Sequence, residues 1–214
     1  MTRWTVAYHH GNLPAALLDA VESAIAEHGV SGLTLREVAR RAGVSHSAPA
    51  HHFGGKAGLL TAFATAGYRL LIEVMTKEVA KAGTDDPAAS TAAMGRGYVQ
   101  FAISHPAHFE VMYRLDALNP EDPGLVRARE SMAAMLGAAI ERCAAAGRLH
   151  GRPADTVFIA AWSLAHGLSA LGISGRLTGR GGGHDPQQLA ADALDLFVQA
   201  VLPNPARPPT PSGS

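Results

Sequence analysis

The stretch Thr34–Phe53, TLREVARRAGVSHSAPAHHF, decides the fold. Thr34 is a favoured helix N-cap, and Glu37 three residues later completes the pattern of a capping box. Gly43 then indicates a helix end and a tight turn, and Ser45 indicates the start of another helix, over about 45–52. Two short helices joined by a tight turn can place the second helix in the major groove of DNA. The stretch therefore predicts a DNA reader near the N-terminus.

The rest of the chain shows helical spacing of its apolar residues, and few segments alternate in the manner of a strand. Asn12 is the expected N-cap of the first helix, which Gly29 ends. The spacing therefore predicts helices along most of the chain. The helices expected beyond Phe53 cover residues 56–81, 88–104, 106–114, 122–147, 154–173 and 186–202.

Composition limits the class of protein. The chain has 214 residues, of which 47% are hydrophobic, so it can bury a sizeable core. Its formal net charge is +0, so any basic surface is local. A single cysteine and the absence of an apolar N-terminal run favour a reducing cytoplasm without a signal peptide, and no membrane span is expected. We expect a flexible loop at 175–186 and a disordered tail at 203–214.

Longer stretches resemble the TetR family of transcriptional regulators. The resemblance is carried by YHHGNLPAALLDAVESAIAEHG (8–29) and LTLREVARRAGVSHSAPAHHFGGKAGLL (33–60). Farther along, TAAMGRGYVQFAISHPAHFEVMYRL (91–115) and AAWSLAHGLSALGISGRL (160–177) look like a regulatory-domain class named for a Trp-His-Gly motif. Here that motif is Trp162, His166 and Gly167.

This resemblance implies an all-α fold, with an N-terminal three-helix bundle that contains the helix-turn-helix and a C-terminal helical domain. It implies a homodimer that represses transcription from a DNA operator with inverted half-sites. It also implies that the C-terminal domain holds a small, partly apolar effector. Binding of this effector would change the distance between the two recognition helices of the dimer and so release DNA. The expected domains are a helix-turn-helix domain at 1–55 and a ligand-binding and dimerisation domain at 56–202, with the helix at 56–81 connecting them. Helices 154–173 and 186–202 are the expected dimer interface.

The expected DNA contacts divide into two groups. Short polar side chains at the start of the recognition helix let its backbone approach the bases, and arginines on the exposed face of the preceding helix meet phosphates. The resemblance adds a phosphate contact at Lys56, and it shows Ala50 where the family often has a phosphate-binding tyrosine. The recognition helix carries no Arg, Lys, Asn or Gln, so no operator sequence follows. An ordinary solvated helix face remains the alternative for the arginines. The expected set is Thr34, Arg36, Arg40, Arg41, Ser45, His46, Ser47, Ala50, His51, His52 and Lys56.

Aromatic and polar side chains of the C-terminal domain are the candidates for ligand binding, because such sites are mostly apolar with a few polar groups. Phe158, Trp162 and His166 recur at a spacing of four residues and so share one helix face. An aromatic stripe of this kind is more often part of a core. The candidates are Tyr98, Phe101, His105, Phe109, Met112, Tyr113, Phe158, Trp162 and His166.

Three other functions compete with the DNA reader. An enzyme is disfavoured, because Cys143 lies on an expected helix without a neighbouring histidine and no known catalytic motif is present. A metal-responsive sensor would use His105 and His108 or the pairs His9–His10 and His51–His52, but no second cysteine or clear third ligand accompanies them. An architectural DNA binder would need a broadly basic surface, which the neutral net charge does not supply.

Overall fold

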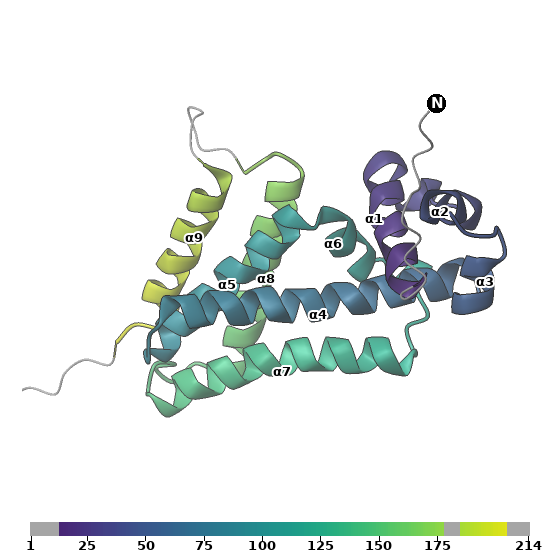
Figure 1. The fold of residues 1–214 in the computed structure, drawn as a ribbon. Coiled ribbons are helices and arrows are strands. Elements are labelled where there is room, and N and C mark those ends of the chain that lie inside the picture. The colour runs from purple at the N-terminus through teal and green to yellow at the C-terminus, as the bar shows by residue number, and fades with distance from the viewer. Residues whose placement is uncertain (1–12, 178–184, 205–214) are drawn as a thin grey trace, which may run out of the picture. The chain divides into compact units, whose positions relative to one another are not determined.

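The computed structural model describes residues 13–177 and 185–204, and all the regular secondary structure in these ranges is helical (Figure 1). The prediction of an all-α fold is confirmed. The expected N-cap Asn12, the pair His9–His10, most of the predicted loop at 175–186 and most of the predicted tail lie outside the described residues. The elements are α1 Leu13–Gly32, α2 Leu35–Ala42, α3 Ala48–Phe53, α4 Lys56–Ala82, α5 Pro87–Ser104, α6 Pro106–Met112, the 3-10 helix η1 Leu115–Ala117, α7 Pro123–Ala145, α8 Ala154–Ile173 and α9 Pro186–Val201.

The chain packs as two compact units. The reader unit takes the described part of Met1–Gly67 together with Ala107–Arg127, and the effector unit takes the described parts of Tyr68–Pro106 and Ala128–Ser214. Helices α4 and α7 each pass from one unit into the other. The packing division places α6, η1 and the start of α7 with the reader, and the expected domain limits at 55 and 56 stay a prediction.

Local chemistry explains most helix ends. Gly29 has φ 68° and ψ 170° and so breaks the helical path inside α1, at the residue where the sequence predicts the helix to end. Asp86 and Asp185 cap α5 and α9, where their side chains accept hydrogen bonds from the backbone N–H groups of Ala88 and Gln187. Both helices begin with a proline. Proline lacks an N–H, and it is favoured here because the N–H groups of the first turn have no partner within the helix.

The prediction of the third helix start is wrong by three residues. Helix α3 begins at Ala48, and Ser45–Ser47 form a turn in which the Ser45 carbonyl accepts from the Ala48 N–H at 3.0 Å. Ser47 precedes the helix without a side-chain capping bond. Pro49 occupies the first turn and is buried, so the turn before it takes over the role expected of a helix cap.

The effector unit is built from α5, α8 and α9, which pack on one another, together with parts of α4 and α7 (Figure 1). One of its core clusters surrounds Cys143, which is fully buried. The Cys143 sulfur lies 3.6 Å from the Thr91 hydroxyl, and burial raises the pKa of this thiol. The side chain therefore behaves as a small hydrophobe, as the sequence suggests.

Two described helices, α4 and α8, are long and apolar enough by length and composition to cross a membrane. The core helix of a soluble protein passes the same test. For α4 the most apolar stretch is 56% buried, but for α8 it is only 28% buried. Helix α8 thus presents apolar surface that its own unit does not cover.

Candidate functional site

The helix-turn-helix of the reader unit is formed by α2, the turn after it and α3. Thr34 caps α2 by accepting a hydrogen bond from the Glu37 N–H at 3.2 Å. Gly43 ends the helix with φ 67°, and Val44 N–H then bonds to the Ala39 carbonyl at 3.0 Å. The left-handed conformation at Gly43 favours glycine, and it turns the chain toward α3. The predicted cap and turn of this motif are thus present.

Glu37 does not close the capping box in the way the sequence suggests. Its carboxylate accepts from Arg40 at 2.8 and 2.6 Å and from Arg41 at 2.6 Å. Arg41 also pairs with Glu27 of α1. The hydrogen bonds from Arg40 and Arg41 lower the pKa of Glu37 to about 2. The acidic residue is therefore the centre of an ion-pair network that joins α2 to α1.

This network divides the three arginines expected to meet DNA. Arg36 is exposed and makes no ion pair with the described residues. Arg40 is exposed but bound to Glu37, and Arg41 is half-buried between two carboxylates. Arg36 is thus the member of this set whose positive charge is available to a phosphate without first leaving a carboxylate.

The recognition side of the motif is exposed. The hydroxyls of Ser45 and Ser47 lie 3.3 Å apart in the turn, with His46 exposed between them. In α3 the side chains of Ala50, His51 and His52 are also exposed, and Lys56 at the start of α4 is half-buried. The structure therefore brings the predicted short polar residues together on one solvent-facing segment.

Helix α3 is pressed against the start of α4 at a glycine that sequence reasoning missed. A Cβ atom at Gly58 would lie 1.9 Å from the carbonyl oxygen of Phe53, so any side chain there would force the backbone to shift. A glycine inside a helix carries no obvious signal of close approach, because helices tolerate isolated glycines for several reasons. Gly58 positions the C-terminal end of the recognition helix.

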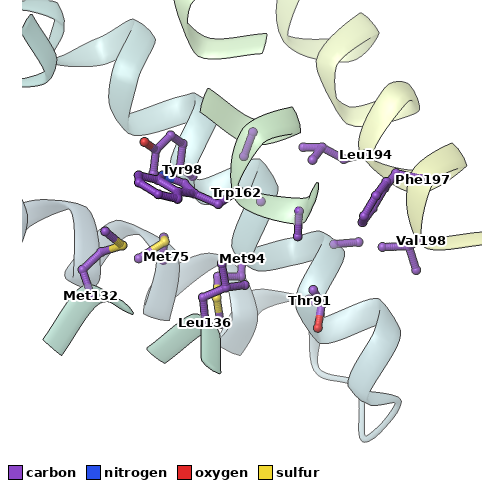
Figure 2. A pocket seen from close by; sticks show the side chains of 14 residues that line it. Met75, Thr91, Met94, Tyr98, Met132, Leu136, Trp162, Leu194, Phe197 and Val198 are labelled. Atoms are coloured by element: carbon purple, nitrogen blue, oxygen red, sulfur yellow. The ribbon is translucent and has the colours of Figure 1, made fainter. Parts of the chain in front are cut away.

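The effector unit contains an apolar cavity with about 40 Å³ of water-accessible space that is partly open to solvent (Figure 2). Figure 2 shows methionine side chains from α4 and α7 together with side chains of α9 around it. The lining residues are Met75, Thr91, Ala92, Met94, Gly95, Tyr98, Met132, Leu136, Ala161, Trp162, Ala165, Leu194, Phe197 and Val198.

Of the predicted ligand residues, Tyr98 and Trp162 line this cavity, and His166 supports it. The Tyr98 hydroxyl lies 3.1 Å from His166 Nδ1. Burial lowers the pKa of His166, so its neutral form predominates at pH 7. The indole Nε1 of Trp162 is buried and has no hydrogen-bond partner within the described part of the chain.

The other candidates lie elsewhere. Phe101 is fully buried beside His105, with ring centroids 5.5 Å apart, and Phe158 packs against the core cluster around Cys143. Phe109, Met112 and Tyr113 belong to the reader unit. Their part in ligand binding stays a prediction.

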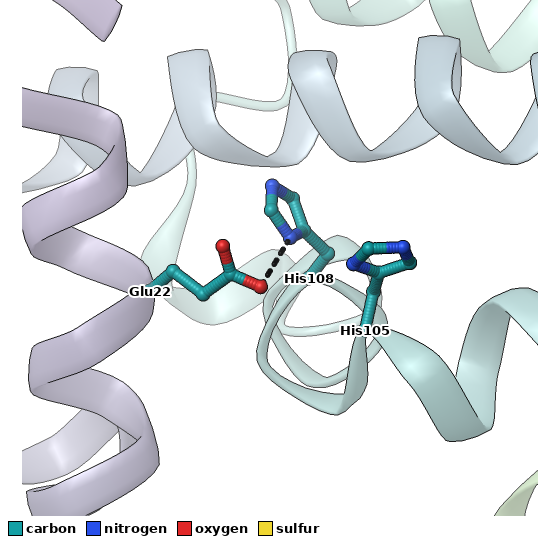
Figure 3. Close-up of side chains that lie close together, drawn as sticks. All are labelled: Glu22, His105 and His108. Carbon is teal, nitrogen blue, oxygen red and sulfur yellow. Dashed lines mark ion pairs between the residues drawn. The ribbon is translucent and has the colours of Figure 1, made fainter. Parts of the chain in front are cut away.

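A pair of rings connects α6 to α4 inside the reader unit. His108 is buried and stacks on Phe63. Its Nδ1 lies 3.7 Å from the Glu22 carboxylate of α1, and Figure 3 shows this pair of side chains. Gly67 leaves room for this arrangement, since a Cβ there would lie 2.8 Å from the Met112 sulfur and 3.1 Å from the His108 ring. The sequence-based candidate His108 is thus part of the packing between these three helices.

Sequence reasoning missed most of the cavity lining. The methionines Met75, Met94 and Met132 come from three different helices, and Phe197 comes from a fourth. Helical periodicity shows which residues share a face of one helix, but it does not show which faces of different helices meet. The sequence signal that could have pointed to the cavity is that the lining residues of these helices are uncharged.

Comparisons with known proteins agree with this arrangement. A family model described as bacterial regulatory proteins, tetR family, matches residues 17–63, and a model described as a tetracyclin repressor-like C-terminal domain matches residues 91–197. The curated HTH-type transcriptional regulator BetI from Burkholderia cenocepacia (strain HI2424) is 31% identical over 176 residues, which cover 71% of this chain and 89% of that protein.

Solved structures show the same fold. A protein of unknown function from Rhodococcus sp. RHA1 has a TM-score of 0.78 and 31% identity, covering 92% of this chain and 98% of that one. AibR in complex with isovaleryl coenzyme A and operator DNA has a TM-score of 0.66 and 15% identity, covering 90% and 99%. None of these three likenesses supports a metal-responsive sensor.

Proposed function

Because this chain belongs to the TetR family of DNA-binding transcriptional regulators, we propose that it represses transcription from an operator and is released by a small molecule bound in the cavity of its effector unit. The observation that carries the DNA-binding part is the exposed segment Ser45–Ser47 between a glycine-capped α2 and α3. Its small polar side chains suit close approach to base edges, while Arg36 and Lys56 flank it as phosphate contacts.

The ligand-binding part is supported by the cavity and by the fold. AibR, which shares this fold, has been crystallised with both a coenzyme A thioester and operator DNA. We assign the effector unit to the Trp-His-Gly class, because Trp162 lines the cavity and His166 holds the Tyr98 hydroxyl beside it. Homologous regulators are not enzymes, and we propose a regulatory rather than catalytic role for this cavity.

A homodimer is the third part of the proposal. Ile159 of α8 and Leu196 of α9 are 52% and 67% exposed, so both helices offer large apolar side chains to a partner. Ala161, Leu168 and Leu194 are buried within the unit itself, so the proposed interface uses the exposed side chains of these two helices. A two-fold axis through α8 and α9 would present two readers to half-sites about 34–36 Å apart. Such a DNA-bound dimer would work in the cytoplasm.

Selection of bound DNA from a random pool, followed by fluorescence anisotropy with the selected sequence, tests the proposal. We expect an inverted repeat and specific binding. Lys56→Ala should weaken binding to all sequences and flatten the salt slope by about one unit, while His46→Ala should relax sequence preference. Lys77→Ala, an exposed lysine later in α4, is the matched control and should change neither. Equal affinity for selected and random DNA would contradict the proposal.

A further inference from the structure

The cavity of the effector unit has a lining that selects ligands by charge. Methionine, aromatic and aliphatic side chains form it, and no side chain in it carries a charge at neutral pH. A charged group that entered would lose its hydration without gaining an ion pair. Met75, Met94 and Met132 supply flexible, polarizable surface that adapts to apolar and aromatic ligands.

The indole N–H of Trp162 is a polar group of this lining that has no hydrogen-bond partner among the described residues. The Tyr98 hydroxyl is paired with His166, and the Thr91 hydroxyl donates to the Pro87 carbonyl at 2.8 Å. The Trp162 N–H is buried and meets no acceptor among them. Because buried donors are nearly always paired in native proteins, an acceptor on a bound ligand is the fitting partner.

The two arginines that line the groove next to this cavity each form an ion pair with a carboxylate. That groove shares Ala92 and Val198 with the cavity and contains Arg96 and Arg148. Arg96 lies 2.6 Å from the Asp195 carboxylate, and Arg148 pairs with Asp86. The phosphates of a coenzyme A thioester would have to displace these carboxylates.

We infer that the effector is an uncharged, largely apolar small molecule with a hydrogen-bond acceptor that receives the N–H of Trp162. This inference rests on the ligand-regulated function proposed above and narrows it. It sets this chain apart from AibR, because the lining offers nothing to a nucleotide phosphate.

Calorimetric titration of the full chain with a matched series of probes tests the ligand class. The series consists of benzylacetone, butylbenzene, phenylbutyrate, a trimethylammonium analogue of the same skeleton, and phenylbutyryl coenzyme A. Benzylacetone should bind at least tenfold more tightly than each charged probe. Tighter binding of any charged probe, or no binding of benzylacetone, would overturn the inference. In a Trp4→Phe variant Trp162 is the only tryptophan, so a change in its fluorescence locates the bound probe.

Trp162→Phe tests the hydrogen bond itself. This variant should weaken benzylacetone binding about tenfold and change butylbenzene binding less than threefold, since only the ketone accepts a hydrogen bond. Retained butylbenzene binding also shows that the cavity has kept its shape. Equal losses for both probes, or no loss for the ketone, would overturn the role of Trp162.

An operator-release assay separates this inference from the proposed function. Benzylacetone that binds as expected but leaves the operator complex intact would contradict ligand-regulated repression while the ligand class stands. Release by phenylbutyryl coenzyme A and not by benzylacetone would support regulation and overturn the uncharged ligand.

Discussion

His108 lies on Phe63 with ring centroids 3.9 Å apart and ring planes 21° from parallel. The stacked rings join α6 to α4 inside the reader unit, and the imidazole also reaches Glu22 of α1. Three helices that are distant in sequence therefore meet at one buried side chain. We therefore expect the stability of the reader unit to depend on a residue that lies outside the DNA-binding motif.

Replacement of this ring should destabilise the protein. His108→Ala removes a buried ring and leaves a cavity, so we expect a loss of about 2–4 kcal/mol in the free energy of unfolding. His108→Phe keeps a stacked ring and should recover at least half of that loss. Urea denaturation followed by circular dichroism measures both. Equal losses for the two variants would show that the stack contributes little.

Acid should weaken the link between α1 and α2. The pKa of Glu37 is lowered from 4.5 to about 2 by Arg40 and Arg41, so its carboxylate stabilises the folded protein above about pH 4.5. This contribution is lost as the pH falls from about 4.5 toward 2. Melting temperatures over this range should therefore fall more steeply for the natural protein than for Glu37→Gln. Glu121→Gln, which changes an exposed acidic residue of the same unit, should leave the steep fall in place.

Two glycine-to-alanine changes should act in opposite directions. At Gly58 an added Cβ would collide with the Phe53 carbonyl, so α3 must shift, with an expected cost of about 1–3 kcal/mol and weaker DNA binding. At Gly137 of α7 no neighbouring atom lies within 4 Å, so alanine should stabilise the helix by about 0.5–1 kcal/mol. Thermal unfolding of the two variants checks the contrast, and stabilisation by both would refute the close approach.

The arginines of α2 should separate into a DNA-binding and a structural member. Arg36→Ala should reduce the salt slope of operator binding by about one unit and leave the unfolding midpoint unchanged. Arg41→Ala breaks the pairs with Glu27 and Glu37, so it should lower the melting temperature. A lowered salt slope in Arg41→Ala at unchanged stability would reverse these assignments.

A charge on the uncovered apolar face should prevent dimer formation. Leu196→Glu would place a carboxylate in the proposed α8–α9 interface, so sedimentation velocity should show a monomer at concentrations at which the natural protein is a dimer. Leu115→Glu changes a leucine that is 49% exposed in the reader unit and serves as the control. A dimer that survives Leu196→Glu would place the interface elsewhere.

Local signals in the sequence predicted the helices well, because caps and breakers act over a few residues. Thr34 and Gly43 mark the ends of α2 that the structure confirms, and Gly29 marks a break inside α1, which runs on to Gly32. The start of α3 was misplaced because Ser45 resembles a cap, while the Ser45–Ser47 turn ahead of Pro49 delays the helix. The ion pairs of Glu37 were missed because this residue suits two roles, a capping box with Thr34 and ion pairs with Arg40 and Arg41 three and four residues later.

The cavity was predicted only in part, for a different reason. The spacing of Phe158, Trp162 and His166 placed them on one helix face, yet Phe158 packs into a core cluster while Trp162 lines the cavity. The cavity forms where α4, α5, α7, α8 and α9 pack together. The apolar pattern of one helix does not show which other helices it packs against, so the sequence did not predict this packing.

Burial of Cys143 has a practical consequence for measuring the motion of the readers. The chain has one thiol, it is fully buried, and its pKa is raised, so maleimide dyes should leave the natural protein unlabelled. A cysteine placed at the exposed position of His51 would then be the only accessible attachment point in each subunit. Energy transfer between two such labels would report the spacing of the recognition helices directly, with no other residue removed beforehand.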